Sequence, residues 1–507
     1  MYSKVHSAVI VGMEGHIVTV EADISDGLPD FNMIGTLSTE VREASGRVRT
    51  ALKNCGYKLP PKKVVINLAP ADIPKYGNSF DMPIAAAVLA SLGIVPAGST
   101  DGIFFAGEIG LAGEIRPIAG AMVLAAAAVE AGFKTAFVPA RNAPEAAVNS
   151  GIRVCGIADI NEMVMLLAEP DRRVYTKVDL MDFSDTDTDI GADLKDVRGQ
   201  TAAKRAAEIA AAGMHNLLLS GPCGTGKSMI AQCIPGIMPA LTLDECIDIS
   251  KVYSICGLIP KDQPLIRERP FRSPHRSVTS GALTGGGRHP KPGELSLATH
   301  GVLFLDELPE MTRDAIETLR QPLEDHKIMV SRVSGSYTFP ADFMLVAAMN
   351  PCPCGYFPDR NKCSCSRSMI ERYQSKVSEP LLDRIDIRVI VDNIPFAQLN
   401  DGDSEPSSAV RQRVERARQM QIKRYKDEPF KYNSRIPAGS IDTYCPLSGE
   451  EKLYMSSVFN SQQMSARGYH RILKIARTIA DLDGKENIEK AHLAEAVALR
   501  NITGARR

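Results

Sequence analysis

The most constraining feature of the sequence is a glycine-rich loop between an apolar run and a helix start. The stretch HNLLLSGPCGTGKSMIAQCI matches G-x-x-x-x-G-K-[ST] at Gly221, Gly226, Lys227 and Ser228. Such glycines let backbone N–H groups wrap phosphates at a helix N-terminus. The pattern predicts that Lys227 contacts the β- and γ-phosphates of ATP and that Ser228 binds Mg²⁺. The predicted nucleotide contacts are Gly221, Cys223, Gly224, Thr225, Gly226, Lys227, Ser228 and Gln200.

Two acidic residues end a second apolar run further along the chain. GVLFLDELPE predicts a buried strand that ends in Asp306 and Glu307. Asp306 suits the same Mg²⁺, and Glu307 suits a base that orients water for attack on the γ-phosphate. A strand ending in acids is otherwise only a solvated strand end. Together with the glycine-rich loop, the two acids form the second half of one predicted site.

Two further polar residues have open interpretations. Asn350 follows the apolar run FMLVAAM, where its amide could hold the attacking water, although Asn before Pro is also an ordinary turn residue. Arg384 lies between Asp383 and Asp386 in LLDRIDIRV. It is either part of a surface ion-pair cluster or an arginine finger contributed to a neighbouring subunit's ATP, which would require a ring.

The composition along the chain predicts four parts. Residues 1–170 alternate β-rich runs with alanine-rich helical stretches, as in a compact α/β domain. Residues 171–195 include VDLMDFSDTDTDIGADL, whose six aspartates predict a solvated linker. Residues 196–395 form a second α/β block with every nucleotide motif, and residues 396–507 show helical spacing.

The order of these motifs resembles that of the magnesium-chelatase-like AAA+ ATPases, and specifically the ComM/YifB family. The resemblance rests on GPCGTGKS, PGELSLATHGVLFLDELPE, LRQPLE, AAMNPCPCG, LLDRIDI and SARGYHRILKIARTIADL, and it covers essentially the whole chain. It implies that Asn350 is sensor 1, that Arg384 is the trans-acting finger and that Arg467 is sensor 2, with Arg471 as the competing choice. PHRSVTS departs from a paired-histidine pattern, which weakens any specific role for His275.

The implied fold is an αβα AAA+ P-loop core with a C-terminal helical lid, preceded by an α+β domain that resembles the Lon protease domain (ribosomal S5 domain 2-like). In Lon a lysine activates the nucleophilic serine. Here Ser79 takes the serine's place, but the lysine's place falls on Met122, whose thioether cannot accept a proton usefully. We therefore expect no peptidase activity, and we expect Ser79 to cap the helix that follows it.

Two segments are candidates for DNA contact. HKIMVSRVSGSYTF, residues 326–339, predicts a hairpin that resembles the pore hairpins of ring helicases, with Arg332 as the candidate phosphate contact and Lys327 behind it. The alternative is an exposed arginine without a function. The insert SGALTGGGRHPKPGE is too glycine-rich for a packed element and predicts a second mobile loop, with Arg288 and Lys291 to offer a polyanion.

Four cysteines lie close together in CPCGYFPDRNKCSC. Four thiolates would satisfy tetrahedral Zn²⁺, but the one-residue spacing within each pair is shorter than usual. Four reduced thiols in an ordered loop are the alternative. The four residues are Cys352, Cys354, Cys363 and Cys365.

Composition and resemblance together imply a function. The formal net charge of −1 argues against a generally basic nucleic-acid coat but allows a local basic patch. No charge-free apolar run is long enough for a membrane span and no secretory signal is recognisable, so we expect a cytoplasmic protein without a membrane partner. The resemblance implies a homo-oligomeric, hexameric ATPase that moves along branched or single-stranded DNA and promotes branch migration in recombination or transformation. The alternatives are a magnesium-chelatase-type motor subunit, a protein-remodelling ATPase and a Lon-like protease.

Overall fold

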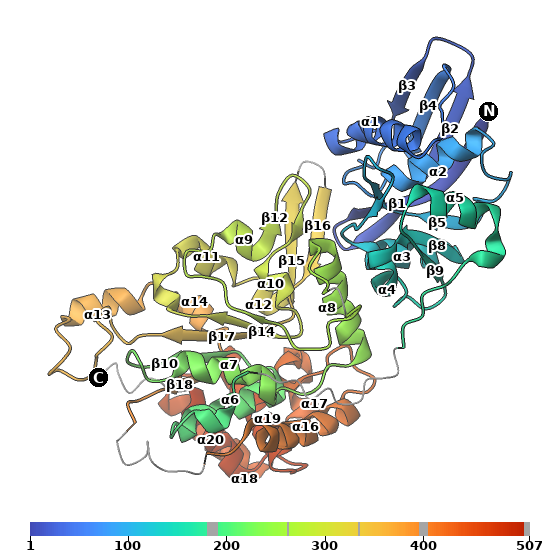
Figure 1. The fold of residues 1–507 in the computed structure, drawn as a ribbon. Helices are drawn as coiled ribbons and strands as arrows, with labels where there is room; N and C mark the ends of the chain where they lie inside the picture. The colour runs from blue at the N-terminus through green and yellow to red at the C-terminus, as the bar shows by residue number, and fades with distance from the viewer. Residues whose placement is uncertain (180–190, 261–262, 333–334, 395–403, 501–507) are drawn as a thin grey trace.

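The computed structural model describes residues 1–179, 191–260, 263–332, 335–394 and 404–500. These residues form an N-terminal α/β unit, a central α/β unit with the glycine-rich loop, and a set of C-terminal helices (Figure 1). Residues 180–190 of the predicted acidic linker lie outside the described part of the chain. The predicted boundaries at residues 170, 195 and 395 stay predictions.

A seven-stranded mixed sheet forms the centre of the N-terminal unit. Its strand order is β3-β4-β2-β1-β5-β8-β9, with β1, β2 and β4 antiparallel and the other neighbours parallel. Alanine-rich helix α2 is buried on nearly every side, because its small side chains allow close packing against the sheet. The strands are β1 (Tyr2–Val11), β2 (Glu14–Ser25), β3 (Asp30–Ile34), β4 (Lys63–Ala69), β5 (Ile103–Phe105), β8 (Thr135–Pro139) and β9 (Arg153–Ile157), with a separate hairpin of β6 (Glu108–Ile109) and β7 (Ile115–Arg116). The helices are α1 (Thr39–Asn54), α2 (Asp81–Ser91), α3 (Ala121–Glu130), α4 (Ala143–Ala146) and α5 (Ile160–Ala168).

The central unit contains a five-stranded parallel sheet. The order is β11-β14-β17-β10-β18, and every neighbouring pair is parallel. All side chains of β14 and β17 are buried, as expected when helices cover both faces of a parallel sheet. The carboxyl ends of β10, β14 and β17 therefore meet at one edge, where open α/β sheets bind ligands. The strands are β10 (Leu217–Ser220), β11 (Phe271–Arg272), β14 (Val302–Leu305), β17 (Met344–Met349) and β18 (Ile387–Ile390).

The helices around this sheet share a core with the C-terminal helices. Buried side chains from α6, α7, α16 and α19 belong to one hydrophobic cluster, among them Ala207, Ile234, Val414 and Ile472. The C-terminal helices thus pack directly against the central unit (Figure 1). Central helices are α6 (Thr201–Gly213), α7 (Lys227–Ile237), α8 (Leu243–Cys256), α9 (Ser280–Thr284), α10 (Glu294–Leu297), α11 (Arg313–Thr318), α12 (Pro322–Asp325), α13 (Arg367–Gln374) and α14 (Glu379–Leu382). C-terminal helices are α16 (Ser407–Arg424), α17 (Ile441–Tyr444), α18 (Gly449–Ser461), α19 (Ala466–Leu482) and α20 (Lys490–Arg500).

Met122 lies where the N-terminal unit meets helix α8. Its backbone N–H faces the Ser254 hydroxyl at 3.4 Å, and the N–H of Gly120 donates to the Ser254 carbonyl at 2.7 Å. The Met122 side chain is fully buried with Val148 and Leu265. The position that would carry the lysine of a Lon-type dyad is therefore part of an apolar contact between the two units.

Two predictions about local structure are wrong. Ser79 does not cap helix α2, which begins at Asp81 without any side-chain cap; the Ser79 carbonyl instead accepts the Gly107 N–H at 2.9 Å. The glycine-rich insert is packed, with helix α9 and a small antiparallel pair formed by β12 (Gly285–Gly286) and β13 (Lys291–Pro292). A Cβ on Gly285 would lie 2.1 Å from the Lys291 carbonyl, so the glycines permit this close packing.

Candidate nucleotide-binding site

The glycine-rich loop connects β10 to α7 in a conformation that requires its glycines. Gly224 and Gly226 have φ values of +79° and +89°, in the left-handed region. Gly221 is required for a different reason, because a Cβ there would lie 2.0 Å from the Val391 carbonyl oxygen on the neighbouring segment. Helix α7 begins at Lys227, so the loop presents the N-terminus of that helix.

Lys227 lies at the centre of the loop and contacts Asn350. Its ammonium donates to the carbonyls of Gly221 at 2.8 Å and Pro222 at 2.6 Å, and to Asn350 Oδ1 at 3.2 Å. Burial lowers the pKa of Lys227. The register pairs Ser220 with Met349, so the residues that follow these strands lie side by side. The structure thus brings together the loop lysine and the predicted sensor 1 residue.

Ser228 and Asp306 form a candidate Mg²⁺ site. The Ser228 hydroxyl donates to Asp306 Oδ2 at 2.9 Å, and Asp306 Oδ1 accepts the Glu307 N–H at 2.8 Å. A hydroxyl and a carboxylate at this spacing offer the oxygen ligands that Mg²⁺ takes beside nucleotide phosphates. Both residues predicted for the metal therefore fit it.

Glu307 is held by an arginine that the sequence analysis did not select. Arg276 donates from Nη1 to Glu307 Oε2 at 2.6 Å, and both side chains are about half exposed. Glu307 has a left-handed backbone, with φ of 48°, a strained conformation that in non-glycine residues clusters at functional sites. The ring of His275, the neighbour considered from the sequence, hydrogen-bonds Ser277. In PHRSVTS, Arg276 stands where the related pattern has a second histidine, and this difference was the sequence signal for Arg276. The sequence analysis considered only His275.

Gln200, Thr225 and Cys223 also lie at the loop. The Gln200 amide donates to the Thr225 carbonyl at 3.2 Å and to the Asp392 carbonyl at 2.6 Å, which ties the start of helix α6 to the loop. The Thr225 hydroxyl donates to the Pro222 carbonyl at 3.0 Å. Cys223 is exposed. Every residue predicted to bind the nucleotide is therefore part of this loop or in contact with it.

Arg384 and Arg467 lie together, at the opposite end of the sheet from Lys227. Both pair with Glu324: Arg384 through Nη2, and Arg467 over 2.9 Å. Arg384 precedes β18, which runs parallel to β10 with Ile387 paired to Leu217. The four residues of β10, about 13 Å of strand, separate this cluster from the loop. Among the described residues, no hydrogen bond or ion pair joins either arginine to the glycine-rich loop of its own chain. The competing residue Arg471 pairs with Asp386 at 3.4 Å.

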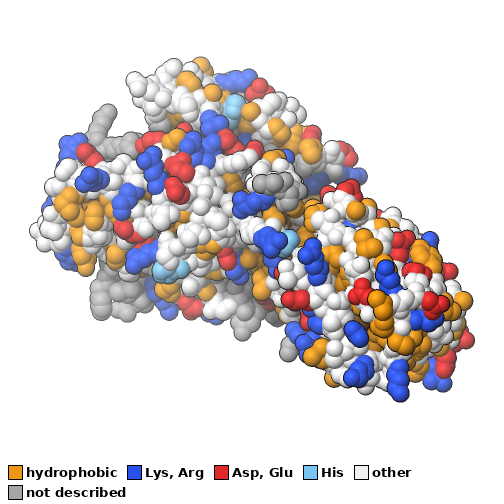
Figure 2. All heavy atoms as spheres, turned by 90° about the horizontal axis from the view of Figure 1, so that it is seen from above, with side chains coloured by type: hydrophobic (Ala, Val, Ile, Leu, Met, Phe, Trp, Pro, Cys, Tyr) orange, Lys and Arg blue, Asp and Glu red, His pale blue; other side chains and the backbone are white. Residues whose placement is uncertain are grey.

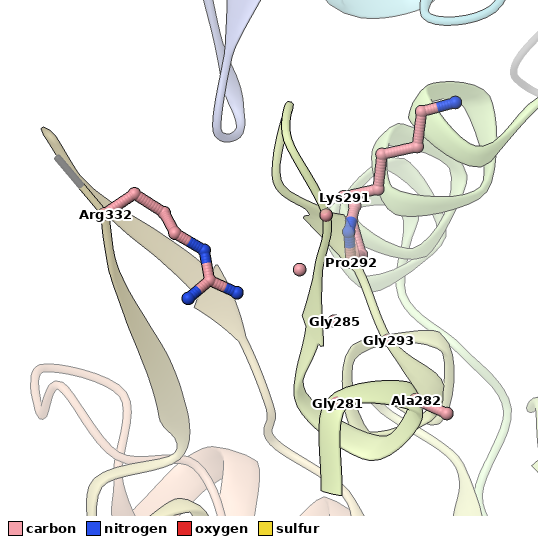
Figure 3. A pocket seen from close by; sticks show the side chains of 9 residues that line it. Gly281, Ala282, Gly285, Lys291, Pro292, Gly293 and Arg332 are labelled. Carbon is pink, nitrogen blue, oxygen red and sulfur yellow. The ribbon is translucent and has the colours of Figure 1, made fainter. Parts of the chain in front are cut away.

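The predicted hairpin is formed by β15 (Lys327–Arg332) and β16 (Gly335–Pro340). Ser334 of its predicted turn lies outside the described residues. Arg332 ends β15 and points toward the glycine-lined β12 segment, while Lys291 points away from it (Figure 3). A guanidinium nitrogen of Arg332 would be 3.0 Å from a Cβ on Gly286. Lys327 is exposed at the other end of β15.

The four cysteines converge after Asn350. Their sulfur atoms all lie within 4.8 Å of one another, with separations of 3.3 Å (Cys352–Cys354), 3.6 Å (Cys354–Cys363) and 3.8 Å (Cys352–Cys363). Among the described residues no other group of histidine, cysteine and acidic side chains has this arrangement. The sequence left a zinc site and four reduced thiols as alternatives, and the convergence of the sulfur atoms is what a zinc site requires.

Fold and site together define a class. A phosphate loop at the end of a parallel strand, a hydroxyl–carboxylate pair suited to Mg²⁺ and a neighbouring acid are the parts of a P-loop nucleotide-binding protein. Three family models match the chain. They are described as "Magnesium chelatase, subunit ChlI" over residues 193–399, "Subunit ChlI of Mg-chelatase" over residues 20–142, and "Magnesium chelatase, subunit ChlI C-terminal" over residues 404–500.

Relatives that match this chain over nearly its whole length identify the family more narrowly. The competence protein ComM of Haemophilus influenzae is 40% identical over 504 residues, covering 98% of this chain and 97% of that protein. YifB of Escherichia coli is 41% identical over 506 residues, covering 99% of this chain and 97% of that protein. The chain belongs to the magnesium-chelatase-like ComM/YifB family, as the motif order predicted.

A weaker similarity connects part of the chain to Lon. The Lon protease of Mycolicibacterium smegmatis is 26% identical over 179 residues, which is 33% of this chain and 23% of that protein. Among the described residues, no helix has the length and apolar character that a membrane crossing needs.

Proposed function

We propose that this protein is a Mg²⁺-dependent ATPase that assembles into a ring and moves along DNA. Lys227 and the loop amides would hold the phosphates, Ser228 and Asp306 the metal, and Glu307 and Asn350 the attacking water. Mg²⁺ would neutralise charge on the β- and γ-phosphates during the reaction. The contacts of Lys227 with Asn350 and of Ser228 with Asp306 support these roles.

The position of Arg384 supports the ring. An arginine finger stabilises the transition state only where it reaches the γ-phosphate. Arg384 and Arg467 lie a strand's length from the loop of their own chain, so the phosphate they can serve belongs to a neighbouring copy. A head-to-tail interface repeated by rotation closes into a ring, and we propose a hexamer.

The observation that carries the DNA assignment is the pairing of Arg332 with a glycine-lined hollow. The hollow is open and is lined by Gly281, Gly285, Gly286, Gly287 and Gly293 with Arg332. Gly281, Gly286 and Gly287 leave backbone accessible, and one arginine beside them offers a phosphate contact that reads no sequence. Figure 2 shows Lys and Arg side chains interspersed with Asp and Glu on the face it presents, which suits a few local contacts.

The resemblance to ComM points to branched DNA as substrate, in recombination or natural transformation. The test is a branch-migration assay with a labelled four-way junction, ATP and Mg²⁺. We expect ATP-dependent conversion to duplex products by the wild type and none by Glu307→Gln. If the wild type hydrolyses ATP without moving the junction or displacing a strand, the protein-remodelling or chelatase-type alternative replaces this proposal.

A further inference from the structure

We propose that Cys352, Cys354, Cys363 and Cys365 bind one Zn²⁺ ion and that this ion, by fixing the cysteine loop against the glycine-rich loop, raises the affinity of the protein for ATP. The cysteine loop is defined as residues 351–365. This inference rests on the proposed ATP site, and it adds a metal that controls that site.

The sulfur positions fit tetrahedral zinc. With Zn–S bonds of about 2.3 Å, ligand sulfurs in a tetrahedron lie about 3.8 Å apart. The sulfur atoms of Cys352, Cys354 and Cys363 lie 3.3 to 3.8 Å apart. A disulfide would need sulfurs at about 2.05 Å. The Phe357 N–H also points at the Cys352 sulfur from 3.4 Å, the kind of outer contact that orients a metal-bound thiolate.

The cysteine loop has only a small apolar core and is otherwise held by hydrogen bonds at its turns, such as that from the Cys363 N–H to the Asp359 carbonyl at 2.8 Å. The apolar cluster around the loop consists of the four cysteines with Phe357 and with Ile370 of helix α13. A segment with so small an apolar core gains its fixed conformation from a metal cross-link more readily than from packing. The metal would join both ends of the loop, because one cysteine pair comes from each end.

Two contacts connect this loop to the nucleotide site. Cys352 follows Asn350 by two residues, and Asn350 contacts Lys227 at 3.2 Å. Gly355 lies against Cys223 of the glycine-rich loop, where a Cβ on Gly355 would be 2.7 Å from the Cys223 sulfur. On the other side, the Gln374 amide of α13 donates to the Pro351 carbonyl at 3.0 Å. An ordered cysteine loop therefore positions Asn350 and supports the phosphate loop.

Because the binding of zinc and the binding of ATP would be thermodynamically linked, the coupling can be measured from either ligand. If zinc raises ATP affinity by some factor, ATP must raise zinc affinity by the same factor. The expected coupling is about tenfold, within the usual range for two sites in one protein. ATPγS should therefore slow or weaken the capture of zinc by a coloured chelator.

The experiment measures zinc content and ATPγS affinity on the full-length protein. We expect about one zinc per chain in the wild type, and loss of zinc with an about tenfold weaker ATPγS affinity in Cys363→Ser. Cys55→Ser, which removes a half-buried thiol from the N-terminal unit, should keep both properties.

Each outcome of these measurements tests one part of the proposal, either the metal site or its coupling to ATP. A folded wild type that binds ATPγS without zinc would overturn the metal site. Zinc removal that leaves ATPγS affinity unchanged would overturn the coupling. If Cys363→Ser does not fold, chelator titration of the wild type with and without ATPγS gives the same decision. Zinc content is read without nucleotide, so a wild type that holds zinc but binds no ATPγS would overturn the ATPase proposal and the coupling while leaving the metal site intact.

Discussion

Arg276 donates a hydrogen bond to Glu307 over 2.6 Å, so the acid that would activate water is paired with a cation from the segment before helix α9. That segment continues through α9 into the glycine-lined β12, which lies beside Arg332. A ligand held by Arg332 and the glycines would therefore act on the same stretch of chain that holds Glu307. If the protein acts on DNA as proposed, the pair would connect DNA contact at Arg332 to ATP hydrolysis at Glu307.

Removal of Arg276 should raise the ATPase rate in the absence of DNA. An exposed ion pair is worth up to about 1 kcal/mol, so releasing Glu307 should increase the basal rate by at most about fivefold. Stimulation by DNA should shrink correspondingly in Arg276→Ala, while Arg276→Lys keeps the charge and should resemble the wild type. Steady-state phosphate release measures both rates. A basal rate that falls in Arg276→Ala would show that the arginine assists the chemistry instead.

Mixing two inactive variants should restore hydrolysis if Arg384 acts on a neighbour. Arg384→Ala should bind ATP normally and lose hydrolysis by roughly 10³-fold, the scale of an arginine finger. Glu307→Gln should also be inactive. In mixed rings, a subunit with intact Glu307 can receive Arg384 from its neighbour, so activity should return. Arg367→Ala, which loses only an exposed pair with Glu371, is the control. Absence of complementation in rings of verified mixed composition would contradict the assignment.

Arg332→Ala should uncouple hydrolysis from DNA. The basal ATPase rate should persist, because Arg332 is not among the residues that contact Lys227, Ser228 or Glu307. Stimulation by DNA and movement of the junction should be lost. The slope of log affinity against log salt should decrease by about one for each phosphate contact removed. Arg332→Lys should retain most of the effect. Unchanged DNA affinity and salt slope in Arg332→Ala would leave the hairpin arginine without a function.

Acid should destabilise the base of the hairpin through His326. Burial, followed by the charge of Arg435, lowers the pKa of His326 from 6.5 to about 4. Between these values the unfolded chain binds more protons than the folded chain, so stability falls as pH falls through this window. Asn tolerates the left-handed φ of 54° at this position and does not titrate, so His326→Asn isolates the effect. Between neutral pH and about pH 5, the Tm of the wild type should fall further than the Tm of the variant. Equal decreases in Tm would contradict the prediction.

The parts of the site that were predictable follow from short-range rules. A glycine-rich loop between a strand and a helix fixes where Lys227 and Ser228 lie, because their spacing along the chain sets the geometry. Asp306 and Asn350 were predictable from apolar runs ending in polar residues, since parallel strands end at a common edge. The registers of β10, β14 and β17 agree with that expectation.

What the sequence did not predict depends on contacts between distant segments. Glu324 appears in LRQPLE without a signal that it pairs with Arg384 and Arg467, which come from elements far along the chain. The packing of the glycine-rich insert was missed because composition indicates flexibility but cannot show that Gly285 and Gly293 approach each other closely. Ser79 was expected at a helix start that the structure places two residues later, at Asp81.

The most direct test of the account is the ATPase rate of the wild-type protein with no DNA and with single-stranded, duplex and branched DNA. We expect Mg²⁺-dependent hydrolysis that rises severalfold with DNA, most with branched DNA, and that is absent from Lys227→Ala and Glu307→Gln under every condition. A rate that is the same with and without every DNA would contradict the central claim that this ATPase acts on DNA.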